Sequence, residues 1–373
     1  MQLVSFSVLE YQDVSLKDIK WAIREINFSH LNLLVGKNSA GKSRMVSALD
    51  RCVDIIMQKL SLDGISQVLV FHLEFKTKAS NKIKYVFAIS NNKVIYEILK
   101  YNDVIHLNRS TGTIYLLTLA NADIKGAKPP VNILLMHSMR DTEKFPFFEE
   151  IIEWATNYKI FRFSHLHTYL GLVPLFNIYK SSENENASKL YSLLDDEKKL
   201  KVLEDINYLG FNLLEIEATD FSFSKENKMM LLSEQGLGFK INQLNISQGL
   251  YRAISLIIFL YYYSDNKCRT IVVDDLSEGL DYDRSTKLGK LLLEKFSDSN
   301  FQFISTTNDT YLMEVIDIKY WNIIHRKNNI VSSFNYNNCK KAFDNFYSSG
   351  LSNADLLSSN YLYDEYIKEN EQN

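Results

Sequence analysis

Proline and cysteine are both scarce in this chain, and each shortage excludes a class of protein. Only 4 of the 373 residues are proline and 13 are glycine, which excludes a collagen-like chain or long flexible linkers. The three cysteines, Cys52, Cys268 and Cys339, stand far apart, so the chain has neither a CxxC pair nor the ligand spacing of a zinc site. Such a low, odd count favours a reducing compartment.

Long apolar runs and an excess of basic residues are also missing. The longest apolar stretch, Ala253 to Tyr263, is too short to cross a bilayer, so we expect no membrane segment. The opening residues lack the basic region and cleavage site of a secretory signal, and we therefore expect a cytoplasmic protein. The formal net charge is −3, which provides no overall field to attract nucleic acid.

The spacing of apolar residues predicts an α/β fold. Residues 2–11 alternate and 31–35 are apolar, which predicts strands, and residues 66–120 read as a β-meander. Helical periodicity follows the glycine-containing loop after residue 35 and recurs at 146–158, 187–206, 248–263 and 282–296. Buried strands are expected at 269–273 and 301–305, and hairpins at 213–236, turning near Lys225 to Lys228, and at 321–336, turning at 327–329.

These elements predict a mixed sheet with an antiparallel β-meander and a helical insertion lobe. The expected parts are an N-terminal half (1–130), a mainly helical insertion lobe (131–245), a second half (246–345) and a polar C-terminal tail (346–373).

The most specific motif runs from residue 36 to residue 43 and matches G-x-x-x-x-G-K-[ST] in full. A strand precedes it and a helix follows, as in a loop whose backbone N–H groups bind phosphate. In such a loop Lys42 would reach the β- and γ-phosphates of ATP, and the Ser43 hydroxyl would bind Mg²⁺. The phosphate-binding residues are Gly36, Lys37, Asn38, Ser39, Ala40, Gly41, Lys42 and Ser43.

A second motif places two acids after the apolar run 271–273. A buried strand would deliver Asp274 at its carboxyl end, where it can hold Mg²⁺, and Asp275 stands where a catalytic base would act. A strand that ends in an acidic turn is common, so the second motif indicates a magnesium site only because the first motif is also present.

Three shorter motifs have both a plain and a functional interpretation. Ser247 and Gly249 open an apolar helix, which is either a simple serine cap or an anion site. Asp281 follows Glu278 and Gly279, and Asn308 follows the strand 301–305; each region can equally be a helix cap.

In this order the motifs resemble those of the ABC-type ATPase superfamily, and more closely the soluble SMC/RecF/OLD-like AAA family ATPases of bacteria. The resemblance covers roughly residues 1–345: Walker A (36–43), signature (246–249), Walker B (271–275), D-loop (279–281) and switch (307–309). It implies an ABC-type head that dimerises head-to-tail, in which Ser247 and Gly249 of one subunit close over ATP and Mg²⁺ held by the other. Asp281 would then cross the interface.

The chain departs from this family pattern at several positions. The base position holds Asp275 rather than Glu, so we expect slow or gated hydrolysis, with Glu278 as a substitute base. The switch holds Asn308 rather than His, and Asn cannot carry a proton at neutral pH. No glutamine can be placed in a Q-loop. Tyr11 could stack on adenine, although a core aromatic is the more common role.

Two functional hypotheses follow from the resemblance. The first is an ATP-gated switch or scaffold, a homodimer that controls a separate effector protein, as many relatives do in bacterial anti-phage defence. The alternative is a RecF/SMC-like repair ATPase that binds DNA, which the overall charge does not support. A transporter subunit and a P-loop kinase fit the motifs less well.

Overall fold

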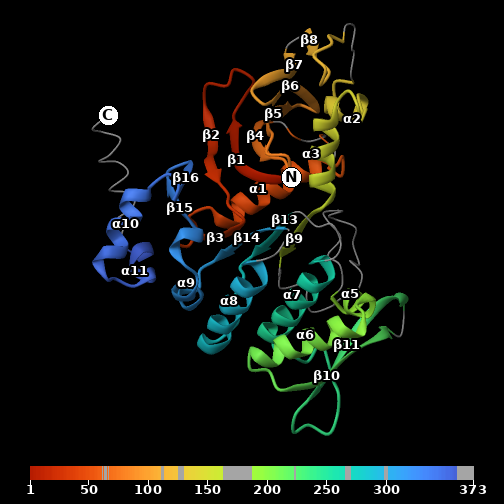
Figure 1. Cartoon of the computed structure of the whole chain (residues 1–373), viewed down its shortest axis with the longest axis vertical. Coiled ribbons are helices and arrows are strands. Elements are labelled where there is room, and N and C mark those ends of the chain that lie inside the picture. Colours follow the sequence, from red (N-terminus) through yellow and green to blue (C-terminus); the bar gives the residue numbers. More distant parts are fainter. Residues whose placement is uncertain are drawn as a thin grey trace.

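The computed structural model describes most of the chain, and its elements are labelled in Figure 1. The described residues are 1–60, 62, 65, 67–110, 113–124, 130–162, 187–221, 224–264, 270–297 and 301–358.

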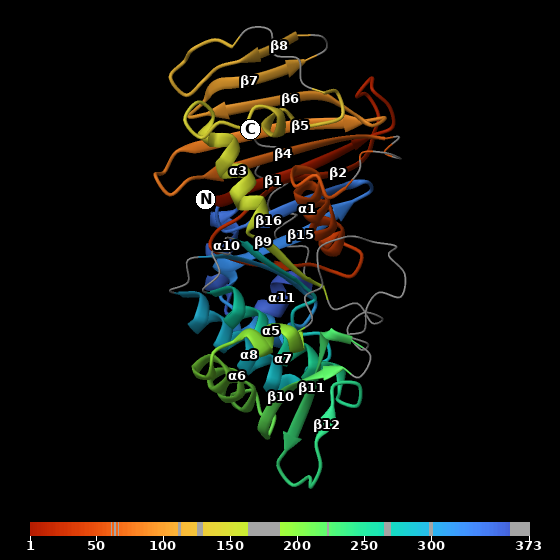
Figure 2. The ribbon, with the colours of Figure 1, turned by 90° about the vertical axis from the view of Figure 1, so that its right-hand side faces the viewer.

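A 13-stranded mixed sheet runs through the molecule, and Figure 2 shows its strands stacked from β8 at one end to β9 at the other. The order is β8-β7-β6-β5-β4-β1-β2-β16-β15-β3-β14-β13-β9. The strands are β1 (Gln2–Tyr11), β2 (Ile19–Asn27), β3 (Leu31–Val35), β4 (Val68–Lys76), β5 (Lys82–Ser90), β6 (Lys93–Tyr101), β7 (Val104–Ser110), β8 (Thr113–Leu116), β9 (Tyr158–Arg162), β13 (Thr270–Asp274), β14 (Gln302–Thr307), β15 (Trp321–Lys327) and β16 (Ile330–Asn335). The expected meander is confirmed as β4–β8, and the hairpin at 321–336 as β15–β16.

The two halves of this sheet differ in strand direction. From β8 to β2 every neighbouring pair is antiparallel, whereas β3, β14, β13 and β9 are parallel to one another. The carboxyl ends of those four strands therefore meet at one edge, which is where ligands bind in open parallel sheets. The loop after β3, the acids after β13 and the residues after β14 all leave the sheet there.

Helices cover both faces of the sheet (Figures 1 and 2). Successive residues of the central strands enter different cores: on β3, Leu33 joins the core of α7 and α8, and Leu34 joins that of α1 and α3. Burial on both faces explains why these strands are apolar runs without alternation. No helix in the described part of the chain is long and apolar enough to span a membrane. The helices are α1 (Lys42–Ile56), α2 (Leu135–Ser138), α3 (Pro146–Thr156), α5 (Ala187–Leu193), α6 (Asp196–Tyr208), α7 (Gln248–Ser264), α8 (Tyr282–Ser297), α9 (Thr310–Val315), η1 (Ile318–Tyr320), α10 (Lys340–Ser349) and α11 (Asn353–Ser358).

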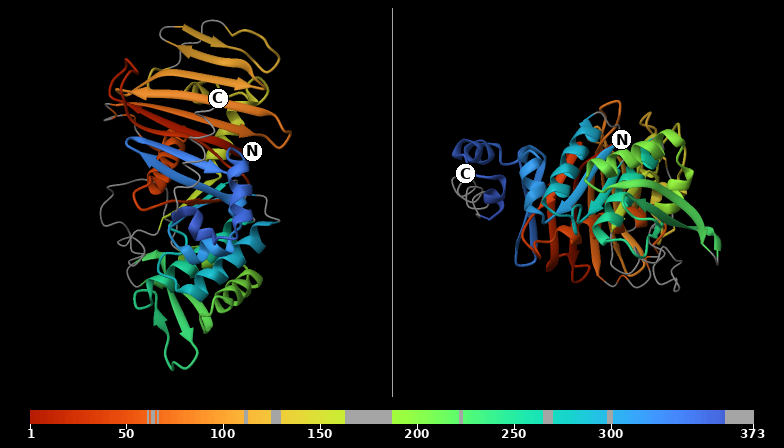
Figure 3. Two further views of the ribbon diagram at one scale, coloured as in Figure 1. Left: turned by 90° about the vertical axis from the view of Figure 1, so that its left-hand side faces the viewer. Right: turned by 90° about the horizontal axis from the view of Figure 1, so that it is seen from below.

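The insertion lobe contains a second sheet, which lies at the opposite end of the molecule from the meander (Figure 3). Its order is β10 (Leu213–Phe221), β11 (Ser224–Glu234) and β12 (Ile241–Asn242), packed with α5, α6 and α7. In the described residues the lobe therefore combines helices with a sheet that includes the hairpin expected at 213–236, and its bounds of 131–245 stay a prediction.

Two boundaries fall elsewhere than the sequence suggests. The β10–β11 hairpin forms, but β11 already begins at Ser224, so the turn predicted near Lys225 to Lys228 comes too late. A tail was expected from residue 346, yet α10 runs through that position. Tyr347 of α10 donates a hydrogen bond to Asp317, and the Asn353 side chain donates to the carbonyl of Met313 at 3.1 Å. Folded structure therefore extends through α11.

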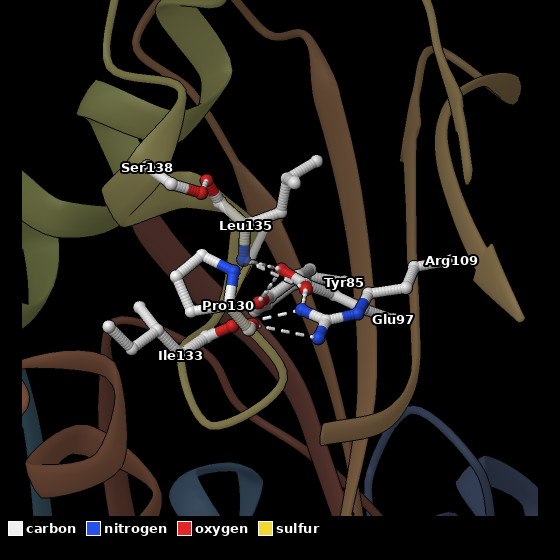
Figure 4. Close-up of polar contacts among 7 residues, drawn as sticks. All are labelled: Tyr85, Glu97, Arg109, Pro130, Ile133, Leu135 and Ser138. Carbon is white, nitrogen blue, oxygen red and sulfur yellow. Dashed lines mark hydrogen bonds and ion pairs between the residues drawn. The ribbon is translucent and has the colours of Figure 1, made fainter. Parts of the chain in front are cut away.

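A buried polar cluster fastens the meander to the segment before α2 (Figure 4). The Glu97 carboxylate is fully buried and accepts hydrogen bonds from the Tyr85 hydroxyl at 2.8 Å and the Leu135 N–H at 2.9 Å. Arg109 lies 3.6 Å from the same carboxylate and donates to the carbonyls of Pro130 and Ile133. Burial raises the pKa of Glu97 to about 7, against the lowering effect of these donors. The cluster lies away from the carboxyl edge of the parallel strands.

Candidate nucleotide-binding site

The loop between β3 and α1 has the backbone that its sequence predicts. Ser39 and Gly41 take left-handed conformations, with φ of 63° and 109°. At Gly36 a Cβ atom would lie 2.6 Å from the carbonyl oxygen of Ile324 on β15, so a side chain cannot be fitted there. The curl that these glycines allow ends at the first turn of α1, and the N-terminus of a helix favours an anion.

Lys42 lies across this loop. Its ammonium group donates to the carbonyl of Gly36 at 2.7 Å and to that of Lys37 at 3.3 Å. Burial lowers the pKa of Lys42, and the nearby carboxylates of Asp275 and Asp274 raise it. Asp274 and Asp275, at the end of β13, are therefore close enough for their charges to act on Lys42.

Asp274 and Asp275 are held by the neighbouring strand β14. The Thr306 hydroxyl donates to the Asp274 carboxylate at 2.6 Å, and the Asp275 N–H donates to the same hydroxyl at 2.8 Å. Asp275 has a left-handed backbone, with φ of 57°. Burial raises its pKa, as do the charges of Asp274 and Glu278. This clustering of like charges around a lysine is typical of a site that binds a cation and an anion together.

The oxygen groups at this edge suit Mg²⁺. Ser43 is exposed on the first turn of α1, and Asp274 is half-buried at the end of β13. Mg²⁺ prefers oxygen ligands and is commonly held by one or two protein groups together with phosphates and water. The described residues contain no cluster of three or more His, Cys, Asp or Glu side chains that would hold a metal alone.

Glu278 is engaged by an arginine of the helix that begins after the signature residues. Arg252 on α7 donates to the Glu278 backbone carbonyl at 3.0 Å and pairs with its carboxylate at 2.5 Å. The Arg252 side chain is 7% exposed, whereas that of Glu278 is 50% exposed. The ion pair therefore joins α7 to the segment that follows β13.

The signature turn packs directly on the D-loop of the same chain. A Cβ atom on Gly249 would lie 2.3 Å from the carbonyl oxygen of Gly279, so this contact requires glycine. Ser247 is exposed and its hydroxyl accepts a hydrogen bond from the Leu250 N–H at 3.3 Å. Ser247 is therefore a helix cap in this chain, and its exposure leaves it open to a second molecule.

Asp281 and Asp309 cap the helices that follow them. Asp281 accepts from the Arg284 N–H at 3.0 Å and pairs with the Arg284 guanidinium at 2.7 Å. Asp309 accepts from the Tyr311 N–H at 2.8 Å and from the Ser285 hydroxyl of α8. Asn308, the predicted switch residue, is exposed between β14 and α9. The plain interpretation of both motifs as helix caps thus holds within one chain.

These contacts join the signature, the D-loop and the switch into one continuous surface. Gly249 touches Gly279, and the Ser285–Asp309 bond ties α8 to α9. Beside that bond, Tyr282 and Tyr311 pack edge to face with ring centroids 4.9 Å apart, and the two residues are 58% and 47% exposed. The surface therefore presents Ser247, Asn308 and an aromatic pair to solvent.

The sequence missed Thr306 as a partner of the two acids, and it missed β9 as a neighbour of β13. Arg162, the last residue of β9, pairs with Asp50 at 3.2 Å and donates to the Ser47 hydroxyl at 3.2 Å. Both partners lie on α1, so β9 fastens the helix that begins with Lys42. The only sequence signal for Thr306 was its position at the end of a buried strand.

Comparison with known proteins gives a fold and no family. No family model matches the chain, and no curated protein matches it. Among solved structures, an SMC head bound to the C-winged helix domain of ScpA covers 90% of this chain and 97% of its own, with a TM-score of 0.53 and 10% identity.

Two other SMC heads are less similar. The Thermotoga maritima SMC head domain gives a TM-score of 0.46 at 11% identity, covering 90% of this chain and 99% of its own. An Smc head with an extended coiled coil, bound to the C-terminal domain of ScpA derived from Pyrococcus furiosus, gives 0.49 at 11% identity, covering 93% of this chain and 99% of its own. The structure with a TM-score of 0.53 shows that the chain has a mixed α/β fold similar to that of an SMC head.

Proposed function

We propose that this chain is an ABC-type ATPase that binds ATP with Mg²⁺ and forms a head-to-tail homodimer around it. One observation carries the proposal: Lys42 of the glycine loop shares its surroundings with Asp274 and Asp275 at the carboxyl edge of the parallel strands. A loop lysine close to acids at the end of a second strand of the same sheet is the arrangement that binds nucleotide phosphates and magnesium.

The residues divide into binding and catalytic roles. The backbone of 36–43 and Lys42 would hold the phosphates, and Ser43 and Asp274 would hold Mg²⁺, which neutralises phosphate charge when bound. Asp275 would orient the attacking water, and Asn308 would hydrogen-bond the γ-phosphate. The ion pair between Glu278 and Arg252 makes Glu278 the weaker candidate for the base.

The second copy supplies what one chain lacks. Ser247 is exposed at the start of α7, where helix N–H groups favour an anion. In a head-to-tail dimer this turn would cover the nucleotide of the partner, with Asp281, Asn308 and the two tyrosines at the interface. ATP would then act as a switch between open and closed states.

A separate effector protein would bind differently to the open and closed states. The SMC head with a TM-score of 0.53 is described as bound to a domain of another protein, ScpA. A comparable partner for this chain fits the switch hypothesis, and a role in bacterial anti-phage defence stays a prediction from the motif resemblance. The DNA-binding alternative gains no support from a net charge of −3.

ATP turnover and molecular mass, measured together on the purified chain, test the proposal. Wild type should dimerise with ATP and Mg²⁺ and hydrolyse it slowly, and Lys42→Ala should do neither. Asp275→Asn should keep the ATP-bound dimer without turnover, whereas Asp275→Glu should raise turnover because its carboxylate reaches one methylene further. Equal turnover in wild type and Asp275→Asn would remove Asp275 from the mechanism.

A further inference from the structure

The guanidinium of an arginine lies over the ring of a tryptophan beside the phosphate-binding loop. Arg44 follows Ser43 on the first turn of α1, and its guanidinium carbon is 3.8 Å from the centroid of the Trp21 ring. The Arg44 side chain is 50% exposed, whereas Trp21 is 9% exposed. One side of the guanidinium is therefore covered by the indole, and half of the side chain faces solvent.

The surroundings fix this arginine in place. Its Nη2 donates to the Glu10 carboxylate at 3.2 Å, and Glu10 also pairs with Lys20 at 3.2 Å. Trp21 packs under the loop, because a Cβ atom on Gly41 would lie 3.8 Å from its ring. A second guanidinium, that of Arg326, lies 5.6 Å from the same ring. Glu10 and Trp21 thus hold the Arg44 guanidinium beside the loop.

A guanidinium held in this way is a stacking surface. Arginine stacks on planar rings as well as pairing with anions, and stacking on the indole leaves its flat face as the binding element. Its Nη2 is already engaged by Glu10, which makes a role as a phosphate clamp less fitting. The planar group that accompanies a triphosphate bound at 36–43 is a nucleobase.

Tyr11, the aromatic that the sequence suggested for this role, is placed differently. It is partly buried and packs against a small cluster of Val68, Val70 and Ala88 on the neighbouring strands. That environment accounts for Tyr11 as a core residue, in agreement with the more common role of such an aromatic.

We propose that the Arg44 guanidinium, supported by Trp21 and Glu10, is the base-stacking platform of the nucleotide site. This inference rests on the proposed function and adds a specificity to it. Stacking strength depends on the area of the base and does not involve its hydrogen-bonding groups. Purine nucleotides should therefore bind more tightly than pyrimidine nucleotides, and ATP and GTP should bind about equally well.

Calorimetric binding of ATP and of inorganic tripolyphosphate separates stacking from charge. Arg44→Lys keeps the charge and removes the plane, so it should weaken ATP binding about tenfold and leave tripolyphosphate binding within about twofold of wild type. Arg140→Lys is the matched control, because Arg140 is also exposed and paired with an acid, Glu149, but lies between α2 and α3. It should change neither affinity.

Tryptophan emission gives a second readout. Trp154 and Trp321 are fully buried, so a change in emission on adding ATP should disappear in Trp21→Phe, and tripolyphosphate should produce none. If Arg44→Lys weakened the binding of both ligands equally, or of neither, the base-stacking role of Arg44 would be wrong, and the proposed nucleotide site would still stand. A wild type that binds neither ligand would overturn the nucleotide site itself.

Discussion

At the scale of single residues, glycine positions link the predicted motifs to the packing of one chain. Gly249 was expected to face the nucleotide of a second subunit, and within its own chain it allows the signature turn to lie against Gly279. The same residue therefore sets the distance between α7 and the loop that leads to α8. Any side chain at position 249 must displace one of those two backbones.

Gly249→Ala should destabilise the chain by about 1–3 kcal/mol, because its methyl group would overlap the carbonyl of Gly279. Gly238→Ala is the control, since nothing lies within 4 Å of a Cβ atom there, and its effect should stay within about 0.5 kcal/mol. Denaturant unfolding of both variants measures the difference. Equal stability of the two variants would mean that the signature turn and the D-loop can move apart without a loss of folding free energy.

The motif residues themselves were predictable, and most of their partners were not. A glycine loop after a strand has a specific pattern, so positions 36–43 could be read from the sequence. Thr306 contacts the acids of Walker B, and Arg252 contacts Glu278, which follows Walker B. Such contacts depend on strand order and helix packing that sequence spacing does not encode.

At the scale of elements, helix α1 carries buried acids behind the nucleotide loop. Asp50 and Asp54 lie one turn apart on it, and Arg162 of β9 pairs with Asp50. Burial raises the pKa of Asp54 to about 6, and the charge of Asp50 adds to the effect. The ionised form of Asp54 is therefore less favourable in the folded chain than in the unfolded chain.

This shift has a definite sign for stability. Because the folded pKa of Asp54 lies above the unfolded value of about 3.9, the cost appears as the pH rises from about 4 to 6 and is complete above that range. Asp54→Asn should therefore stabilise the chain at pH 8, by up to about 3 kcal/mol, and the gain should vanish near pH 4. Thermal unfolding across this range, with the exposed Asp18→Asn as control, checks it. A gain that is independent of pH would contradict this account.

Strands and helices with strong periodicity were predicted well, and short or edge elements were not. The meander and α7, α8, β13 and β14 follow clear apolar patterns. Strand β9 is only five residues long and begins two residues after α3 ends, so the helix expected at 146–158 reaches its first residue and the rest was not predicted. Its role is defined by pairing with β13, which lies more than a hundred residues later.

At the scale of the whole molecule, the sheet places two unlike surfaces on one chain. The glycine loop, Lys42 and the acids at the end of β13 form the proposed site for phosphates and magnesium at the carboxyl edge of the parallel strands. The signature turn, the D-loop and the switch form a continuous surface with exposed Ser247 and two exposed tyrosines. A head-to-tail pair would bring the first surface of each copy against the second surface of the other.

The most direct test of this account is complementation between two inactive variants. Lys42→Ala lacks the phosphate-binding lysine and Ser247→Arg blocks the signature turn, so each alone should fail to dimerise with ATP. In a head-to-tail dimer the mixture forms one intact site, with Lys42 from one chain and Ser247 from the other. Light scattering and turnover should therefore recover on mixing, while each variant alone stays monomeric and inactive. A mixture as inactive as its components, with both variants folded, would contradict a site shared between two copies.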